Sequence, residues 1–278
     1  GSNVPLTRTP DAHFLTEVRY KGTKVVSVSP DYAESTTSSD AWLNVKAGTD
    51  AALAMAMGHV ILKEYYIDKE TPYFKEYAKE FTDMPFLVRV EDINGAVQPG
   101  RFLNAKDLGR QEEGSDFQMV LIDEITNEIV IPNGTMGERH TNPQKWNLRL
   151  ENRDTGAKID PRLSVFDQRE DVTIVKLPYF GDEEHEGVIE RAIPTITVQT
   201  VDGPVKVTTV YDLILANYGI DRGIGGEVAK AYTDDTPYTP TWQEKITGIK
   251  ADVAIATARE FADNAEKTKG RSMIIMGG

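Results

Sequence analysis

The sequence predicts an α/β protein in which a Rossmann-like parallel sheet with helices is interrupted by a β-rich insertion. Helical and strand-like segments alternate in the first part of the chain, which favours parallel strands joined by crossover helices. Short strand-like runs and Asn-Gly or Asp-Gly turns then dominate, before helical patterns return. We expect three segments: an α/β segment (1–85), the β-rich insertion (86–207), and a helical segment returning to the α/β domain (208–278).

In the first segment, capping residues and β-branched runs define the elements. Thr9-Pro10 is a typical helix start and Gly22 a typical helix end. Thr49 is the expected N-cap of a long helix rich in Ala, Met and Leu. The expected order is a helix from residue 9 to 22, a strand over 24–29, a short helix over 32–38, a strand over 42–45 and a helix over 50–66.

The rest of the chain is read by the same signals. Thr71-Pro72 and Thr239-Pro240 each begin a helix, and Gly219 and Gly248 each end one. The expected elements are helices over 72–81, 211–218, 240–247 and 252–265, and strands over 86–90, 117–122, 128–131, 172–177 and 273–276.

Composition excludes several classes of protein. The 278 residues contain no cysteine, so disulfides, Cys-ligated zinc and Cys-ligated iron–sulfur clusters cannot form within this chain. The net charge of −13 argues against nonspecific nucleic-acid binding. The longest apolar run, over 51–62, is too short for a membrane span, so we expect no direct membrane insertion. The four histidines have no metal-type spacing.

The negative charge is unevenly distributed along the chain. Residues 1–60 hold five Lys and Arg against six Asp and Glu, a net charge of −1, which leaves −12 for the rest. An anionic cofactor would therefore be repelled least by the first sixty residues.

Three short loops in this region are candidates for nucleotide contacts. Ser2 and Asn3 lie in a small-residue loop before a helix, where free backbone N–H groups favour a pyrophosphate. Ser29 and Asp31 follow a predicted strand, where hydroxyl or acidic side chains can hold a ribose hydroxyl. The alternative for each loop is that its residues only form a turn or cap a helix, without binding a ligand.

The third candidate is Gly48-Thr49-Asp50, at the start of the long helix. The Asp50 carboxylate can accept hydrogen bonds from both N1–H and N2–H of a guanine. The alternative is that Asp50 only favours the positive end of the helix dipole.

Taken in order, several blocks resemble the alpha subunits of membrane-bound respiratory nitrate reductases, which are molybdenum enzymes of the dimethyl-sulfoxide-reductase family. The resemblance covers both ends of the chain and is loosest in the acidic middle. The matching blocks are residues 1–5, 8–14, 28–34, 48–52, 56–60, 82–85, 207–213, 258–265 and 270–275.

The resemblance implies a cofactor and a role for each loop. The family binds two molybdopterin guanine dinucleotides around one Mo. By this resemblance Ser2 and Asn3 lie near a pyrophosphate, Ser29 and Asp31 near a ribose, and the loop at residues 48–50 near a guanine. Many relatives have Asp-Pro-Arg where this chain has Ser29-Pro30-Asp31, so Asp31 cannot supply their positive charge.

The resemblance also implies the setting of the reaction. The parent enzyme reduces nitrate to nitrite and works with an iron–sulfur beta subunit and a membrane cytochrome subunit, at the cytoplasmic face of the membrane. Its own iron–sulfur cluster and the protein ligand to Mo are expected before residue 1. The chain starts like the loop after a first strand and stops on an apolar strand, which predicts a fragment of a longer protein. Because the upstream groups and half of the pocket walls would be missing, we expect the fragment to be inactive alone and to retain little or no cofactor. The alternative is a tag scar at residues 1–2 and an edge strand at the end.

Two other functions compete with this hypothesis. A self-contained Rossmann enzyme would need an intact first strand and a G-x-G-x-x-G turn, and the sequence has neither. A noncatalytic nucleotide-binding or protein-interaction domain would use the insertion as its contact surface. Selenate, chlorate or perchlorate are alternative substrates for a close relative.

Overall fold

A computed structural model describes residues 6, 9–134, 149–179 and 187–276. The chain forms two compact units. Unit 1 combines residues 1–64 with residues 229–278, and unit 2 is the continuous stretch 65–228. This division rests on contacts, and the functional roles of segments 1–85, 86–207 and 208–278 stay a prediction.

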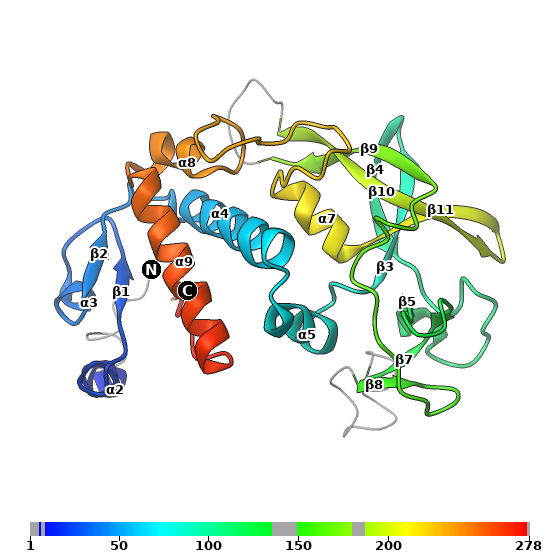
Figure 1. The fold of residues 1–278 in the computed structure, drawn as a ribbon, viewed down its shortest axis with the longest axis horizontal. Coiled ribbons are helices and arrows are strands. Elements are labelled where there is room, and N and C mark those ends of the chain that lie inside the picture. The colour runs from blue at the N-terminus through cyan, green and yellow to red at the C-terminus, as the bar shows by residue number, and fades with distance from the viewer. Residues whose placement is uncertain (1–5, 7–8, 135–148, 180–186, 277–278) are drawn as a thin grey trace. The chain divides into compact units, whose positions relative to one another are not determined.

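Unit 1 contains both helices and strands, which confirms the α/β class (Figure 1). Its only strands among the described residues, β1 and β2, run parallel, with Val26 opposite Ala41 and Val28 opposite Leu43. A wider Rossmann-like sheet is not formed by the described residues. The elements are α2 (Thr9–Tyr20), β1 (Val26–Val28), α3 (Glu34–Thr37), β2 (Ala41–Leu43), α4 (Asp50–Ile61), α8 (Pro240–Thr247) and α9 (Ala251–Thr268).

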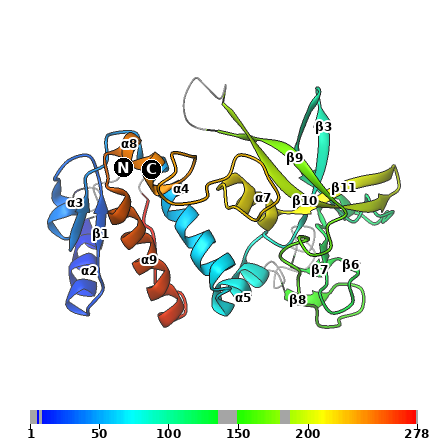
Figure 2. The same cartoon turned by 45° about the horizontal axis from the view of Figure 1, so that its top comes forward.

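The core of unit 1 joins segments that are far apart in the sequence. Leu43, Val45 and Leu53 pack with Ile249 and Ala254, and α4 lies beside α8 and α9 (Figure 2). Helix α9 turns a face of small residues inward, since its buried residues are all alanines: Ala254, Ala258, Ala262 and Ala265. Side chains of this size let helix backbones approach closely, so α4 and α9 pack tightly.

Unit 2 is dominated by an antiparallel sheet in the order β4-β3-β11-β10-β9. The sheet strands are β3 (Leu87–Ile93), β4 (Ala96–Phe102), β9 (Asp171–Pro178), β10 (Val188–Thr200) and β11 (Gly203–Thr209). Smaller elements are η1 (Leu62–Asp68, a π-helix that starts in unit 1), α5 (Pro72–Phe81), η2 (Ser115–Phe117), β5 (Leu121–Ile122), β6 (Ile129–Val130), β7 (Pro132–Asn133), β8 (Arg149–Asn152) and α7 (Val210–Asn217).

Buried carboxylates hold unit 2 together. Asp212 in α7 is fully buried, and both its oxygens are used. One oxygen accepts from Ser164 Oγ (2.6 Å) and Arg222 Nη1 (2.6 Å). The other accepts from the Val165 N–H (2.9 Å) and Thr209 Oγ1 (2.9 Å). This carboxylate therefore ties one helix to two separate loops.

Asp107 and Asp123 are further buried carboxylates of unit 2. Burial opposes the ionisation of Asp107, but Arg101 and the Asn104 N–H outweigh it, so its pKa lies below the usual value. For Asp123 burial likewise opposes ionisation, and bonds from the Asp160 N–H and Thr126 outweigh it, so its pKa is also lowered. Both groups favour the folded state when ionised.

A glycine permits a close contact on β10. Gly226 forms a β-bridge with Arg191 and has φ +81°. A Cβ built on Gly226 would lie 2.5 Å from the Ala192 nitrogen and 3.0 Å from the Arg191 Cα. Only glycine fits this position, because any side chain would displace the backbone of β10.

The structure corrects the expected strand over 273–276 and forms strands that were not expected. Residues 273–276 form no strand, because no described strand pairs with them, and their side chains are exposed. Strands β4, β10 and β11 were not expected as strands, and each contains a proline: Pro99, Pro194 and Pro204. Pro194 fits because the pairing of β10 with β11 starts only at Ile196, so no ladder bond on that side is lost.

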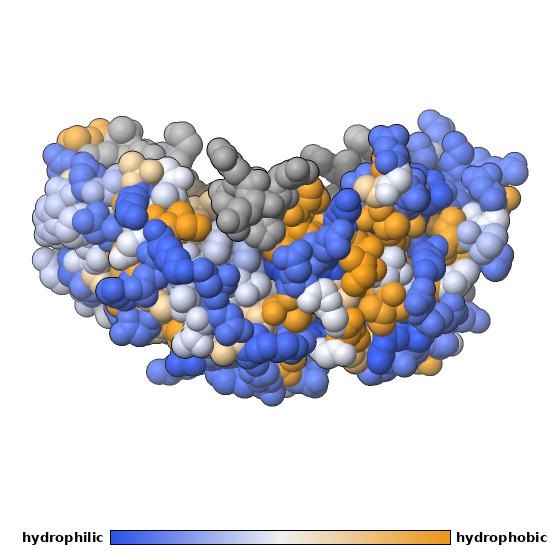
Figure 3. All heavy atoms as spheres, turned by 90° about the horizontal axis from the view of Figure 1, so that it is seen from above, coloured by the Kyte–Doolittle hydropathy of each residue, from blue (hydrophilic) through white to orange (hydrophobic). Residues whose placement is uncertain are grey.

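The described surface mixes polar and apolar residues, as the face in Figure 3 shows. None of the helices in the described ranges combines the length and apolar composition needed to cross a bilayer. Within those ranges no group of three or more His, Cys, Asp or Glu is arranged to hold a metal ion.

Candidate functional site

The parallel pair β1–β2 places two of the predicted loops at one edge. Val28 lies opposite Leu43, and the Ser29 N–H donates to the Leu43 carbonyl at 3.2 Å. The loop at Ser29–Asp31 leaves the carboxyl end of β1. The chain that leads to Gly48 leaves the carboxyl end of β2, next to it. Ligands of open α/β sheets bind at such strand ends.

The turn after β1 is ordered by its own side chains. Ser29 Oγ donates to the Asp31 carbonyl at 2.7 Å. Trp42 Nε1 donates to the Ser29 carbonyl at 3.0 Å and lies 3.2 Å from Ser29 Oγ. The Trp42 ring also meets Tyr32 edge-on, with centroids 5.3 Å apart. The Ser29 hydroxyl proton is therefore used locally, and its oxygen, which already accepts from Trp42 Nε1, has one acceptor lone pair left.

The Asp31 side chain is exposed. No described residue makes a hydrogen bond or ion pair with its carboxylate. A carboxylate of this kind can accept hydrogen bonds from sugar hydroxyls without breaking an existing interaction.

The loop before α4 has an open backbone at Gly48. Its φ is +80°, and a Cβ built there would meet no atom within 4 Å. Here glycine is required by the backbone conformation and not by crowding. The space beside the Gly48 backbone is therefore open to a ligand.

Thr49 precedes α4 but does not cap it with its side chain as expected. Its hydroxyl donates to the Lys46 carbonyl at 2.6 Å instead, which closes the preceding turn. Asp50 follows in the first turn and is exposed. No described residue pairs with its carboxylate, and the helix dipole favours negative charge at this end.

Lys46 was not identified from the sequence as part of this edge. Its backbone N–H donates to the Thr247 carbonyl at 3.0 Å, and its Nζ lies 3.4 Å from the Lys245 carbonyl. These contacts fix the loop against the end of α8. The sequence signal for Lys46 was a basic residue two positions before Gly48. Trp42 was also missed, and its signal was an indole N–H that needs a hydrogen-bond acceptor.

The remaining predicted residues are placed differently. Ser2 and Asn3 lie outside the described residues, so their contact with a pyrophosphate stays a prediction. The loop at Ser29–Asp31 directly follows β1, whereas Gly48–Asp50 begin five residues beyond the end of β2. Buried His59 packs edge-on against Tyr232 at 5.8 Å between ring centroids, as expected of a packed histidine.

Comparison with known proteins gives matches over the whole chain. A family model described as molybdopterin oxidoreductase matches residues 1–278. The nitrate reductase alpha chain of Bacillus subtilis (strain 168) is 53% identical over 277 residues, covering 100% of this chain and 22% of that protein. The respiratory nitrate reductase 1 alpha chain of Escherichia coli (strain K12) is 48% identical, covering 100% of this chain and 23% of that protein.

A more distant relative acts on a different oxyanion. The perchlorate reductase subunit alpha of Dechloromonas aromatica (strain RCB) is 31% identical, covering 100% of this chain and 24% of that protein. The chain thus spans less than a quarter of the length of these relatives.

Proposed function

Because the chain belongs to the molybdopterin oxidoreductase family, we propose that it forms part of the cofactor pocket of a nitrate reductase catalytic subunit. The observation that supports this proposal is that two open segments follow neighbouring parallel strands, Ser29–Asp31 directly after β1 and Gly48–Asp50 five residues beyond β2. In the parent enzyme the reaction is the reduction of nitrate to nitrite. The molybdenum cofactor supplies two electrons and a site for oxygen-atom transfer when bound.

Nitrate is favoured over other oxyanions by the order of the similarities. Identity is 53% and 48% with two nitrate reductase alpha chains, against 31% with the perchlorate reductase subunit.

The residues of the second loop fit a guanine. The exposed Asp50 carboxylate has two acceptor oxygens, which match the adjacent N1–H and N2–H donors of guanine. The open space at Gly48 lets the base approach the backbone. Thr49 holds the loop through its bond to the Lys46 carbonyl. We assign guanine recognition to Gly48, Thr49 and Asp50.

The first loop fits a ribose and the start of the chain a pyrophosphate. The Asp31 carboxylate and the Ser29 hydroxyl oxygen are acceptors for ribose hydroxyls. We assign the pyrophosphate to Ser2 and Asn3, from the resemblance alone. The cofactor we infer is molybdopterin guanine dinucleotide, with an iron–sulfur cluster only outside this chain.

The assembly proposed for the parent enzyme follows from the same family. Two relatives are named alpha chains, which indicates a complex of several subunits. We propose an iron–sulfur beta subunit and a membrane cytochrome subunit as the partners, at the cytoplasmic face of the membrane. No nucleic acid is part of this proposal.

The guanine assignment is tested by titrating the chain with GMP and with AMP. We expect GMP to bind more tightly, and Asp50→Asn to weaken GMP about tenfold or more, since bonds to a charged acceptor contribute about 1.5–3 kcal/mol. The control is Asp252→Asn, in the first turn of α9, which should leave GMP binding unchanged. Equal binding of GMP and AMP by the unaltered chain would refute the assignment.

A second test uses the parent enzyme, where the pocket is complete. Asp50→Asn should lower the GMP released by acid hydrolysis of the purified enzyme, which reports cofactor content apart from turnover. The chain alone should neither reduce nitrate with a reduced dye nor retain stoichiometric Mo. Either activity or retained Mo in the isolated chain would contradict the proposal that it forms only part of the pocket.

A further inference from the structure

Strand β10 extends beyond its neighbour β9. The last pair between them is Thr195 with Asp171. On its other side β10 stays paired with β11 as far as Thr200. Residues 197–199 therefore have a neighbouring strand on one side only, which is an open sheet edge.

The backbone groups of this edge point away from β11. Successive residues of an antiparallel strand turn their N–H and C=O groups to opposite sides. The Thr195 carbonyl accepts from the Glu170 N–H at 2.9 Å, and the Val201 N–H donates to the Asp107 carbonyl at 2.9 Å. Thr197 and Gln199 lie between these two and face the same side. The open edge is thus a slot about three residues long, closed at each end.

A side chain, and not a strand, occupies one position of the slot. The Thr197 N–H donates to Glu170 Oε2 at 3.0 Å. A carboxylate here blocks uncontrolled edge-to-edge pairing, in the way natural proteins protect sheet edges. Because Glu170 is exposed, it can move aside when a better-placed acceptor arrives.

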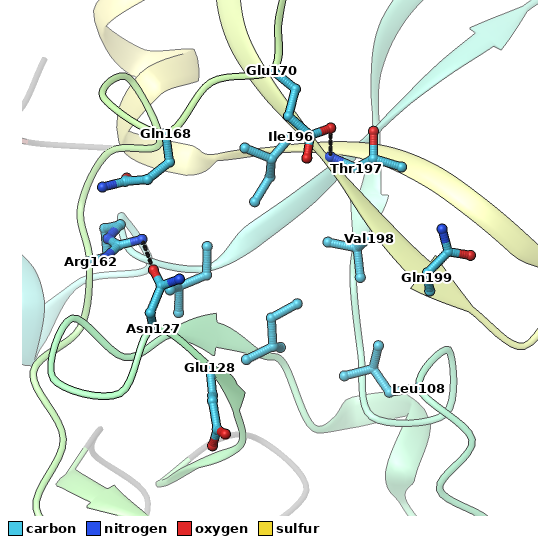
Figure 4. Close-up of a pocket in the computed structure, with 12 residues that line it drawn as sticks. Leu108, Asn127, Glu128, Arg162, Gln168, Glu170, Ile196, Thr197, Val198 and Gln199 are labelled. Atoms are coloured by element: carbon cyan, nitrogen blue, oxygen red, sulfur yellow. Dashed lines mark hydrogen bonds between the residues drawn. The ribbon is translucent and has the colours of Figure 1, made fainter.

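A pocket with an apolar floor and polar side chains around it lies beside the slot (Figure 4). It has a volume of about 480 Å³, and its lining includes residues 196–199 of β10. Leu108, Ile129 and Ile196 line it and are only partly buried where they pack on the core of unit 2. The pocket is large enough for one or two side chains of a peptide that lies along the edge.

The rim of the pocket carries uncompensated negative charge. Glu128 and Glu170 line it and are exposed, and no described cation pairs with either. Arg162 also lines the pocket, but its guanidinium is engaged by Asn127 Oδ1 at 2.7 Å and Glu124 Oε2 at 3.4 Å. The slot therefore complements a positively charged segment.

We propose that the slot at residues 197–199 binds an extended peptide segment of a partner protein by strand addition. The segment presents an apolar side chain to the pocket and a basic side chain to Glu128 and Glu170. Backbone hydrogen bonds to Thr197 and Gln199 supply affinity, and the pocket and its rim supply specificity.

The proposal is tested with blocked six-residue peptides of alternating Val and Lys, titrated into the full chain by calorimetry. The matched peptides replace Lys with Glu, or carry N-methyl groups along the backbone. We expect the Val-Lys peptide to bind, the Val-Glu peptide to bind at least tenfold more weakly, and the N-methylated peptide not to bind.

Variants locate the binding on the chain. Gln199→Pro removes the edge N–H and should abolish binding, whereas Gln199→Ala keeps it and should bind normally. Glu128→Gln should weaken the Val-Lys peptide several-fold, and Glu80→Gln, an exposed carboxylate on α5, should not. If Gln199→Pro fails to fold, the N-methylated peptide still tests the backbone contacts.

Three outcomes would overturn the proposal. One is no binding of the Val-Lys peptide at millimolar concentration, and another is equal binding of the Lys and Glu peptides. The third is self-association of the chain that Gln199→Pro abolishes, because a second copy would then occupy the slot.

Discussion

The two units use the same side chain, aspartate, in opposite ways. In unit 2, Asp212 is buried and accepts four hydrogen bonds, one of them from Arg222. In unit 1, Asp31 and Asp50 are exposed at strand ends, and no described residue pairs with either carboxylate. A saturated carboxylate stabilises the fold, whereas an unsaturated one has acceptors left for a ligand. Carboxylates that can bind a ligand are therefore recognised by having no hydrogen-bond or ion-pair partner among the described residues.

The sharpest test of this comparison makes one substitution in both units. Asp212→Asn turns an amide donor toward groups that are already donors and leaves Arg222 buried without its charge partner. We expect a loss of about 3–5 kcal/mol in the free energy of unfolding, against less than about 1 kcal/mol for Asp50→Asn. Urea unfolding of the full chain measures both. Equal losses for the two variants would contradict the distinction between a stabilising carboxylate in unit 2 and an unpaired one in unit 1.

Glycine gives a second comparison, with a smaller effect. Gly226→Ala in unit 2 adds a clash with the Ala192 nitrogen to an unfavourable φ, for a loss of about 3 kcal/mol. Gly48→Ala in unit 1 meets only the unfavourable φ, because the space around it is open, so about 1 kcal/mol is expected. If the two variants unfold at the same urea concentration, the close approach of Gly226 to β10 is refuted.

Acid should lower the free energy of unfolding of unit 2 through its buried carboxylates. The loss should be smaller than that caused by Asp212→Asn or Gly226→Ala. The pKa values of Asp107 and Asp123 are lowered in the folded state. Their contribution is therefore present above the unfolded pKa of about 3.9 and is lost as pH falls through the folded values. The free energy of unfolding, measured in urea between pH 7 and pH 2, should decline below about pH 4. Asp107→Asn should make that decline shallower, and an unchanged slope would contradict the assignment.

The smallest expected effect concerns the turn beside the proposed ribose site. Trp42→Phe keeps an aromatic ring but removes the indole N–H that bonds the Ser29 carbonyl. We expect a loss of about 1 kcal/mol. Tyr32→Phe is the matched control, because no described residue bonds its exposed hydroxyl, and it should be neutral. A neutral Trp42→Phe would show that the turn is ordered without the tryptophan.

Local signals in the sequence predicted most helices, and tertiary pairing explains most of the errors. Pro72 and Pro240 marked helix starts that the structure confirms. Strand β10 was not predicted and contains Pro194. Its register with β11 shows that the missing proline N–H costs no ladder hydrogen bond on that side. Residues 273–276 were expected as a strand from apolarity alone, but a strand also needs a neighbour.

The candidate site was predictable in its residue types and not in its contacts. The resemblance and the strand order both pointed to Ser29, Asp31 and the loop at residues 48–50. The sequence could not show that Thr49 bonds the Lys46 carbonyl, because that choice depends on how the preceding turn closes. The hydrogen bond from Trp42 to the Ser29 carbonyl could not be predicted either, because it depends on how β2 pairs with β1.

The discontinuity of unit 1 constrains the order in which the protein can fold during synthesis. Leu43, Val45 and Leu53 complete their core only with Ile249 and Ala254, which follow the continuous stretch 65–228. At about 5–20 residues per second, the ribosome needs roughly 8–33 s to make that stretch. During this interval the first part of unit 1 lacks residues 229–278, whereas unit 2 has all of its own residues as soon as the interval ends. The nascent chain therefore presents an apolar, aggregation-prone segment within residues 1–64, which a chaperone would be expected to shield until residues 229–278 arrive.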